Sequence, residues 1–300
     1  MSTTADEFYS FDYLPTRTAD GHYPSITGYN FTELYFSEPF FFNKDYVRQK
    51  LAFIGHLSSY TVHISLAYVL IIFALKRVMQ SREKLSLRYL LIAWNICLAA
   101  FSIVGTMRVW PEFVYTLRTL GFDYTVCNSD SFYGVAGFWS YLFTLSKLAE
   151  LFDTFFIVMR KQKLIFLHYY HHASILVFCF SAYSEAASTG RWFGAMNYLI
   201  HSLMYTYYAL RAMRVTMPKK FSLFITSLQI ALMIFGIFIS FYVLYRKQFD
   251  TSTSQCSTHY HNIKYSLLMY LSYFLLFLNF LLQSYIFQNN NKNKTSTKSD

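Results

Sequence analysis

Seven stretches of this chain are apolar for about 20 residues each, which is the length needed to cross the hydrocarbon core of a bilayer as a helix. They lie at residues 56–75, 89–107, 137–159, 164–183, 192–210, 221–245 and 265–286. Hydrophobic residues make up 54% of the chain and charged residues only 14%, so most of it cannot form a water-facing surface. Because backbone polar groups in lipid must be paired within the segment, each stretch is predicted to be helical. The sequence therefore predicts an all-α integral membrane protein with seven transmembrane helices.

The regions outside these stretches are short. We expect a polar and aromatic lumenal segment at 1–50, a single seven-span membrane domain at 51–287, and a cytosolic tail at 288–300. The tail is rich in Asn, Lys, Ser and Thr, a composition typical of disorder.

The net charge of +10 comes from short basic clusters between the apolar runs, which argues for membrane topology and against a nucleic-acid partner. Most of these residues fall in alternate connections and in the tail: Lys76, Arg77, Arg82, Lys84, Arg88, Arg160, Lys161, Lys163, Arg211, Arg214, Lys219, Lys220, Lys292, Lys294 and Lys298. Far fewer lie in the opposite loops: Arg108, Arg118, Arg191, Arg246, Lys247 and Lys264. Since Lys and Arg favour the cytosolic side, the C-terminus is predicted to be cytosolic and the N-terminus lumenal.

Two features of the predicted lumenal side bear on this topology. Asn30-Phe31-Thr32 is a glycosylation sequon, and it would be usable there. Cys127 and Cys256 fall in two lumenal loops, where oxidation is permitted, so they are candidates for a disulfide.

Four of the predicted spans contain polar or ionisable residues, each of which costs roughly 2.5–3.5 kcal/mol when a charge is inserted into a membrane. The third span contains Lys147, Glu150, Asp153 and Thr154; the fourth His168, His171 and His172; the fifth Asn197, His201, Met204, Tyr205, Tyr207 and Tyr208; and the sixth Thr226 and Gln229. The three clustered histidines are spaced i, i+3 and i+4, which places them on one helix face.

The depths of these residues agree across helices. At 1.5 Å per residue from the nearest cytosolic basic cluster, Glu150, His171, His201 and Gln229 all lie roughly 12–15 Å deep. A shared polar chamber in the cytosolic half of the membrane is the simplest explanation.

Purely structural interpretations compete for several of these residues. Lys147 and Glu150 are explained as well by a charge-neutralising pair that holds helices together. Asn197 and Gln229 fit interhelical hydrogen bonds, and Tyr205 and Tyr208 fit an aromatic belt at the cytosolic interface. Three histidines on one face, matched in depth by His201, favour a functional site.

A metal site is one hypothesis for the histidines, because neutral imidazole is a good ligand for iron or zinc. Membrane di-iron enzymes supply roughly eight ligands, whereas only four of the nine histidines of this chain share the predicted chamber. A single zinc ion on the three clustered histidines remains open. The other hypothesis is nucleophilic and general acid–base catalysis by imidazole. Cys97 and Cys179 are poor alternatives, because apolar burial disfavours the thiolate.

Three motifs together resemble the ELO family of very-long-chain fatty acid elongases. The family's KxxExxDT element is matched by Lys147-x-x-Glu150-x-x-Asp153-Thr154. Its histidine box is matched by His168-x-x-His171-His172. Its NxxxHxxMYxYY element is matched by Asn197-x-x-x-His201-x-x-Met204-Tyr205 followed by Tyr207-Tyr208. A fourth element, TxxQxxQ, is matched at Thr226 and Gln229, but Leu232 occupies its last position. The stretch from Lys161 to His172 is more similar to the branch acting on saturated and monounsaturated chains than to the polyunsaturated branch.

This resemblance implies a 3-ketoacyl-CoA synthase of the endoplasmic reticulum membrane. It would condense a long-chain acyl-CoA with malonyl-CoA, releasing CO2 and CoA, and six of its seven helices would enclose an acyl tunnel. His171 and His201 would be the principal catalytic residues, with His168 and His172 polarising the thioester. Lys147, Glu150, Asp153, Asn197, Tyr205, Tyr208 and Gln229 would support the site or bind substrate.

The resemblance also implies that no metal or redox cofactor is needed. A ketoacyl reductase, a dehydratase and an enoyl reductase would complete the elongation cycle, and the enzyme is a candidate homodimer. The alternatives left open are a membrane di-iron desaturase or hydroxylase, and a non-enzymatic lipid transporter.

Overall fold

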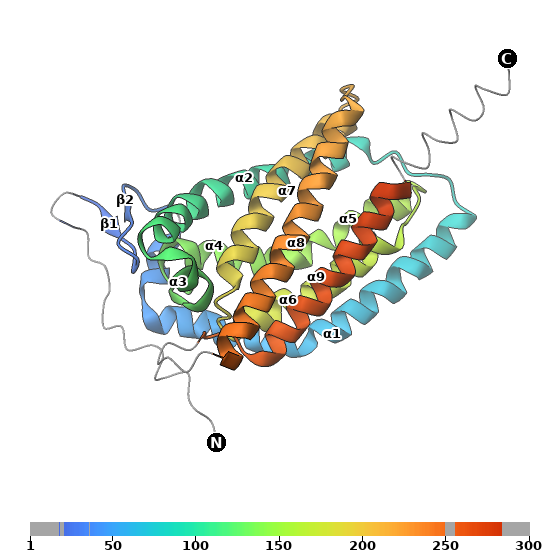
Figure 1. Ribbon diagram of the computed structural model, residues 1–300. Coiled ribbons are helices and arrows are strands. Elements are labelled where there is room, and N and C mark those ends of the chain that lie inside the picture. Colours follow the sequence, from blue (N-terminus) through green and yellow to red (C-terminus); the bar gives the residue numbers. More distant parts are fainter. Residues whose placement is uncertain (1–17, 19–20, 36, 250–255, 284–300) are drawn as a thin grey trace, which may run out of the picture.

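The computed structural model describes residues 18, 21–35, 37–249 and 256–283, and within them the chain is almost entirely helical (Figure 1). The elements in order are β1 (Tyr23–Pro24), β2 (Asn30–Phe31), η2 (Glu38–Phe42), α1 (Lys44–Gln80), α2 (Arg88–Thr119), α3 (Gly121–Cys127), η3 (Asp130–Phe132), α4 (Gly134–Glu150), α5 (Phe152–Met159), α6 (Phe166–Ser184), α7 (Gly190–Ala212), α8 (Lys219–Phe249) and α9 (Tyr260–Leu281). The strands β1 and β2 form an antiparallel pair in which Tyr23 is opposite Phe31.

The described parts of the seven apolar stretches are almost entirely helical, which confirms the all-α prediction. Four helices are long and apolar enough to cross a membrane: α1, α2, α8 and α9. The helices between them, α4 to α7, carry most of the polar residues singled out above. The predicted tail at 288–300, the end of the last stretch and much of segment 1–50 lie outside the described residues.

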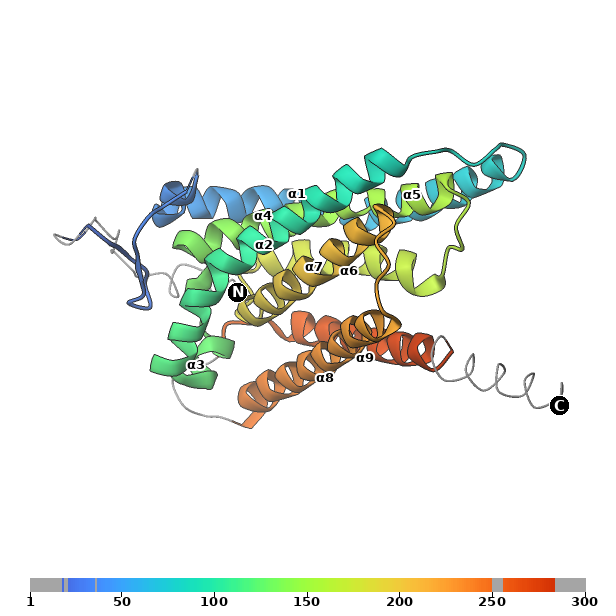
Figure 2. The same cartoon turned by 90° about the horizontal axis from the view of Figure 1, so that it is seen from above.

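The helices pack in three long pairs: α1 lies along α6, α2 along α7, and α8 along α9. Figure 2 shows α8 and α9 as a layer on one side of α6 and α7, with α1, α2 and α4 on the other side. α4 contacts α2, α6 and α7, whereas α9 contacts α6 and α8 contacts α7. The histidine-bearing helices α6 and α7 therefore lie between the layer of α8 and α9 and the layer of α1, α2 and α4.

The predicted third span is divided at Leu151 into α4 and α5. Around it the backbone makes tighter i→i−3 hydrogen bonds, from the Leu151 N–H to the Leu148 carbonyl (3.4 Å) and from the Thr154 N–H to the Leu151 carbonyl (3.3 Å). Such 3₁₀-type turns inside a helix often mark functional positions. Here the turn separates Glu150 from Asp153 and Thr154.

One end of the bundle is closed by a disulfide and by hydrogen bonds. Cys127, at the end of α3, forms a disulfide with Cys256, which precedes α9. Near it, the Lys247 ammonium donates to the carbonyls of Cys256 (3.1 Å) and Thr258 (2.6 Å). These contacts join α3 to the connection between α8 and α9.

The segment before α1 packs into the bundle through Glu38. This carboxylate is fully buried and accepts hydrogen bonds from Arg108 of α2 (2.6 and 2.9 Å) and from the Trp139 indole of α4 (2.8 Å). Because the charge of Glu38 is paired with Arg108, its burial is compensated.

Candidate active site

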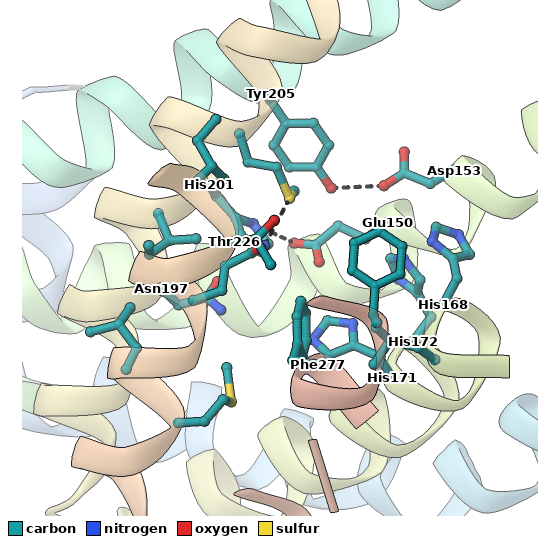
Figure 3. A pocket seen from close by; sticks show the side chains of 18 of the residues that line it. Glu150, Asp153, His168, His171, His172, Asn197, His201, Tyr205, Thr226 and Phe277 are labelled. Carbon is teal, nitrogen blue, oxygen red and sulfur yellow. Dashed lines mark hydrogen bonds and ion pairs between the residues drawn. The ribbon is translucent and has the colours of Figure 1, made fainter. Parts of the chain in front are cut away.

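A cavity of about 360 Å³ lies among α4, α5, α6, α7, α8 and α9. Every residue predicted to be catalytic or supporting, except Lys147, lines it: Glu150, Asp153, His168, His171, His172, Asn197, His201, Tyr205, Tyr208 and Gln229. Figure 3 shows Glu150 between His201 of α7 and the three histidines of α6. The helices thus bring together side chains that the sequence spacing could only place at similar depths.

The three histidines of α6 lie in contact near the beginning of that helix. The ring centroids of His168 and His172 are 4.5 Å apart, and those of His171 and His172 are 5.3 Å apart. The Tyr273 ring of α9 lies 4.9 Å from the His171 ring, and its hydroxyl donates to the His171 carbonyl (3.2 Å). Tyr273 of α9 therefore packs against the histidine box and bonds its backbone.

His201 lies next to the carboxylate of Glu150 in the cavity wall. Its Nδ1 lies 3.7 Å from Glu150 Oε1, and its ring meets the Tyr205 ring edge-on at 5.2 Å. The second oxygen of Glu150, Oε2, is buried and has no hydrogen-bond partner among the described residues. The carboxylate is thus in position to interact with the protonated form or the Nδ1–H of His201.

Lys147 lies behind the cavity wall, where it pairs with Glu150. Its Nζ donates to Glu150 Oε1 (2.7 Å) and to Asn197 Oδ1 (3.3 Å), and lies 4.1 Å from the centre of the Phe143 ring. Only 1% of the Lys147 surface is exposed. The lysine therefore neutralises Glu150 and ties α4 to α7 through Asn197.

Asp153 lies one turn beyond Glu150 and accepts two hydrogen bonds from other helices. The Trp94 indole of α2 donates to its Oδ1 (2.6 Å), and the Tyr205 hydroxyl of α7 donates to its Oδ2 (2.7 Å). Tyr205 is only 2% exposed, so in this structure it belongs to the site and not to an interfacial belt. The sequence analysis did not identify Trp94, because a tryptophan in an apolar span gives no signal of its partner.

His168 also forms a hydrogen bond with a residue that does not line the cavity. Its Nε2 lies 3.0 Å from the Thr154 hydroxyl, which lies 2.5 Å from the Tyr68 hydroxyl of α1. Tyr68 was likewise missed in the sequence. The hydrogen bonds of Tyr68, Thr154 and His168 link the outermost helix to the histidine box.

The wall formed by α8 is less polar than the opposite wall. Thr226 and Gln229 line the cavity, and the Gln229 amide lies 3.6 Å from the Met204 sulfur. Leu232 also lines the cavity, so the position where the family pattern has a second glutamine presents an apolar side chain here.

A second, smaller cavity of about 50 Å³ shares the lining residue Phe193 with the first. Its other lining residues are mostly aromatic or small, and they include Cys179, Phe178 and Tyr183. Cys179 is buried in this apolar environment, away from the histidines, while Cys97 is exposed on the outer surface.

The described residues offer no metal centre. Among them, no three His, Cys, Asp or Glu side chains lie close enough to hold a metal ion. Of the remaining histidines, His56 and His63 lie exposed on α1, and His261 bonds Glu185 (2.6 Å) at the far end of the bundle.

Comparison with known proteins gives one consistent result. The model of the ELO family, described as the GNS1/SUR4 family, matches residues 54–294. The chain is 44% identical to human "Very long chain fatty acid elongase 6" over 223 residues, which cover 74% of this chain and 83% of that protein. It is 45% identical to the Drosophila melanogaster protein of the same name over 234 residues (76% and 72%). It is 42% identical to "Putative fatty acid elongase 3" of Caenorhabditis elegans over 232 residues (77% and 72%).

Proposed function

Because this chain belongs to the ELO family, we propose that it is a fatty acid elongase that condenses a long-chain acyl-CoA with malonyl-CoA. The products are a 3-ketoacyl-CoA, CoA and CO2. The observation that carries this proposal is the convergence of four histidines from two helices on one cavity. A smaller, mostly apolar cavity shares the lining residue Phe193 with it. The polar cavity would hold the reacting carbons, and the apolar one would accept part of the acyl chain.

The first step proposed is transfer of the acyl group to an imidazole. Among the described residues, the ring nitrogens of His171 have no hydrogen-bond partner, whereas His168 is bound by Thr154 and His201 faces Glu150. The Nδ1 of His172 also has no partner among the described residues, but it is buried. We therefore assign His171 as the nucleophile. Its nitrogen attacks the thioester carbon, the carbon–sulfur bond breaks, and the proton lost by the imidazole goes to the CoA thiolate.

In the second step malonyl-CoA loses CO2, and the electron pair of the broken bond forms an enolate. The enolate carbon attacks the acyl carbon, and the His171 imidazole leaves with the electron pair of its bond to carbon. His201 acts as the second imidazole: it gives a proton to the departing His171 nitrogen and then regains one from water, so one proton is consumed per turnover. Glu150 faces the Nδ1 of His201 during this step. His168 and His172 polarise the thioester carbonyl.

The remaining residues of the site support these four. Lys147 donates a hydrogen bond to Glu150, and Asn197 accepts one from the lysine. Asp153 fixes the Tyr205 hydroxyl near the cavity. Tyr208 and Gln229 line the wall near bound substrate.

We further propose the seven-span topology, with the N-terminus in the lumen of the endoplasmic reticulum and the C-terminus in the cytosol. The histidines lie near the beginning of α6, whereas the disulfide follows α3, beyond the far end of α2. A catalytic cavity on the cytosolic side and a disulfide on the oxidising side fit this orientation. The membrane domain at 51–287 would be catalytic, and it would pass its product to the reductases and dehydratase of the cycle.

The proposed chemistry requires no metal or redox cofactor, because every bond change is accounted for by imidazole, thiolate and CO2. The family match and the relatives named above favour neither a di-iron desaturase nor a lipid transporter. The similarity of the histidine-box region supports saturated and monounsaturated acyl-CoA as substrates.

The test is a condensation assay on membranes that contain the full chain, with labelled malonyl-CoA and a panel of acyl-CoAs. Wild-type protein should form labelled 3-ketoacyl-CoA. His171→Ala and His201→Ala should each lower its rate at least about 100-fold, the usual contribution of a catalytic acid, base or nucleophile. His63→Ala, an exposed histidine on α1, is the matched control and should retain the full rate. Full activity of either cavity variant would refute the assignment.

A further inference from the structure

Tyr68 of α1 does not line the catalytic cavity, but hydrogen bonds connect it to a histidine that does. Tyr68 of α1 is 7% exposed, and its hydroxyl lies 2.5 Å from that of Thr154, which is fully buried. Thr154 in turn lies 3.0 Å from Nε2 of His168. The three groups form a continuous hydrogen-bonded chain from α1 through α5 to α6.

Thr154 differs from the other threonines in the described helices. Those residues donate their hydroxyl to a backbone carbonyl three or four residues earlier, as Thr144 does to Ser140 (3.0 Å) and Thr206 to Ser202 (2.6 Å). The turn at Leu151 divides the helix just before Thr154, and its hydroxyl bonds Tyr68 and His168 instead. The Thr154 proton is therefore available to a side chain.

The protons of this chain can be assigned by counting donors. A hydroxyl carries one proton, and neutral imidazole carries one proton on one of its two nitrogens. If His168 Nε2 donated to Thr154, then Thr154 would donate to Tyr68, and the Tyr68 proton would have no acceptor among the described residues. If Tyr68 donates to Thr154 and Thr154 donates to Nε2, both hydroxyl protons have an acceptor. The imidazole proton is then on Nδ1, which Thr154 does not contact.

We propose that Tyr68 and Thr154 are positioning residues that hold His168 in the tautomer with its proton on Nδ1. His168 lines the cavity. In this tautomer its remaining donor, the Nδ1–H, is the group assigned to the thioester carbonyl. The inference rests on the proposed condensation, because it assigns His168 the polarising role in that reaction. It adds α1, which contributes no residue to the cavity wall, to the catalytic machinery.

The kinetic test compares two substitutions on the same face of α1. Tyr68→Phe removes the terminal donor and should lower kcat roughly 10- to 100-fold, the usual effect of losing an outer partner of a functional histidine, with the KM for acyl-CoA nearly unchanged. Ser65→Ala is the control, because Ser65 is similarly buried and bonds α6 through the Ala173 carbonyl (2.9 Å), not through a histidine. It should retain the wild-type kcat.

Two variants of Thr154 separate the relay from packing. Thr154→Ser keeps the hydroxyl and should retain most of the activity. The kcat of Thr154→Val should fall as much as that of Tyr68→Phe. The kcat of the double variant should be no lower than that of Thr154→Val alone, as expected for residues that act in series. Wild-type kcat in Tyr68→Phe, or an equal loss in Ser65→Ala, would overturn the inference.

A spectroscopic test does not depend on turnover. In protein labelled with ¹⁵N-histidine, the His168 signals, assigned by their loss in His168→Ala, should show a non-protonated Nε2 in wild type. Thr154→Val removes the donor to Nε2, so its His168 should show a protonated Nε2. An unchanged tautomer would refute the relay even if the enzyme is an elongase. The expected change in a protein without condensation activity would instead leave the relay standing and refute the proposed function.

Discussion

At the scale of single residues, the four histidines of the site differ in what holds each ring. His168 is fixed by Thr154, His201 faces Glu150, and the Nδ1 of His172 is buried without a partner among the described residues. The ring nitrogens of His171 have no such partner either, and His171 lines the cavity. Identical side chains can thus take different roles, because the role of an imidazole depends on which nitrogen carries a proton and what that nitrogen faces.

The buried pair of Lys147 and Glu150 gives a prediction that separates structure from catalysis. Lys147→Met alone leaves the Glu150 charge uncompensated, which typically costs about 3–5 kcal/mol of folding free energy. We expect little folded protein from this variant in a detergent-extraction and size-exclusion assay. Lys147→Met combined with Glu150→Gln removes both charges and should restore the yield of folded protein.

The double variant should nevertheless turn over slowly in the condensation assay, because His201 no longer faces a carboxylate. If it folds and retains wild-type turnover, the pair has only a structural role. The sequence left these two interpretations open, and the 3.7 Å approach of His201 Nδ1 to Glu150 favours the catalytic one.

The residues that motifs mark were largely predictable, and their partners were not. Spacing within one helix placed His168, His171 and His172 on one face, and depth placed His201 near them. Trp94 and Tyr68 could not be found this way, because they lie on α2 and α1 in apolar surroundings. Their significance lies in contacts to residues more than 50 positions away in the sequence, which depend on how helices pair.

At the scale of helices, apolar runs located the elements but not their irregularities. The division at Leu151 has no proline or glycine to announce it, and it nonetheless sets apart Glu150 and Thr154. The pairing of α2 with α7 also depends on a detail that hydropathy does not reveal. Gly105 of α2 lies against the ring of Tyr198, whose hydroxyl donates to the Trp139 carbonyl of α4 (2.8 Å).

A methyl group at Gly105 would overlap the Tyr198 ring, whereas one at Gly194 of α7 would meet no atom within 4 Å. Gly105→Ala should therefore lower the free energy of unfolding by about 1–3 kcal/mol, as overpacking usually does. Gly194→Ala, the matched control, should leave stability unchanged or raise it slightly, because alanine favours the helix over glycine. Thermal unfolding of the two variants in the same detergent compares them, and equal midpoints would contradict the packing described.

At the scale of the whole molecule, polarity is arranged along the bundle axis. The histidine cavity lies near the beginning of α6, whereas Glu38, the Cys127–Cys256 disulfide and the β1–β2 hairpin gather near the end of α2. A protein that performs acyl-CoA chemistry at one end and keeps a disulfide at the other fits a membrane that separates a reducing from an oxidising compartment.

This arrangement predicts the side on which the N-terminal segment lies. Asn30 is exposed on β2, so the sequon should be glycosylated if this end is lumenal. Wild-type protein expressed in a eukaryotic cell should shift to higher mobility on a gel after glycosidase treatment. Asn30→Gln should migrate at that position without treatment. A wild-type protein that the glycosidase does not shift would contradict the proposed orientation.

The central claim is that an imidazole of this cavity carries the acyl group between the two substrates. Incubation of the purified protein with long-chain acyl-CoA alone, without malonyl-CoA, tests it directly by mass spectrometry of the quenched and digested chain. We predict release of CoA and an acyl group on the peptide that contains His171, absent from His171→Ala. A wild-type enzyme that condenses both substrates yet shows neither acylated histidine nor CoA release from acyl-CoA alone would contradict the account.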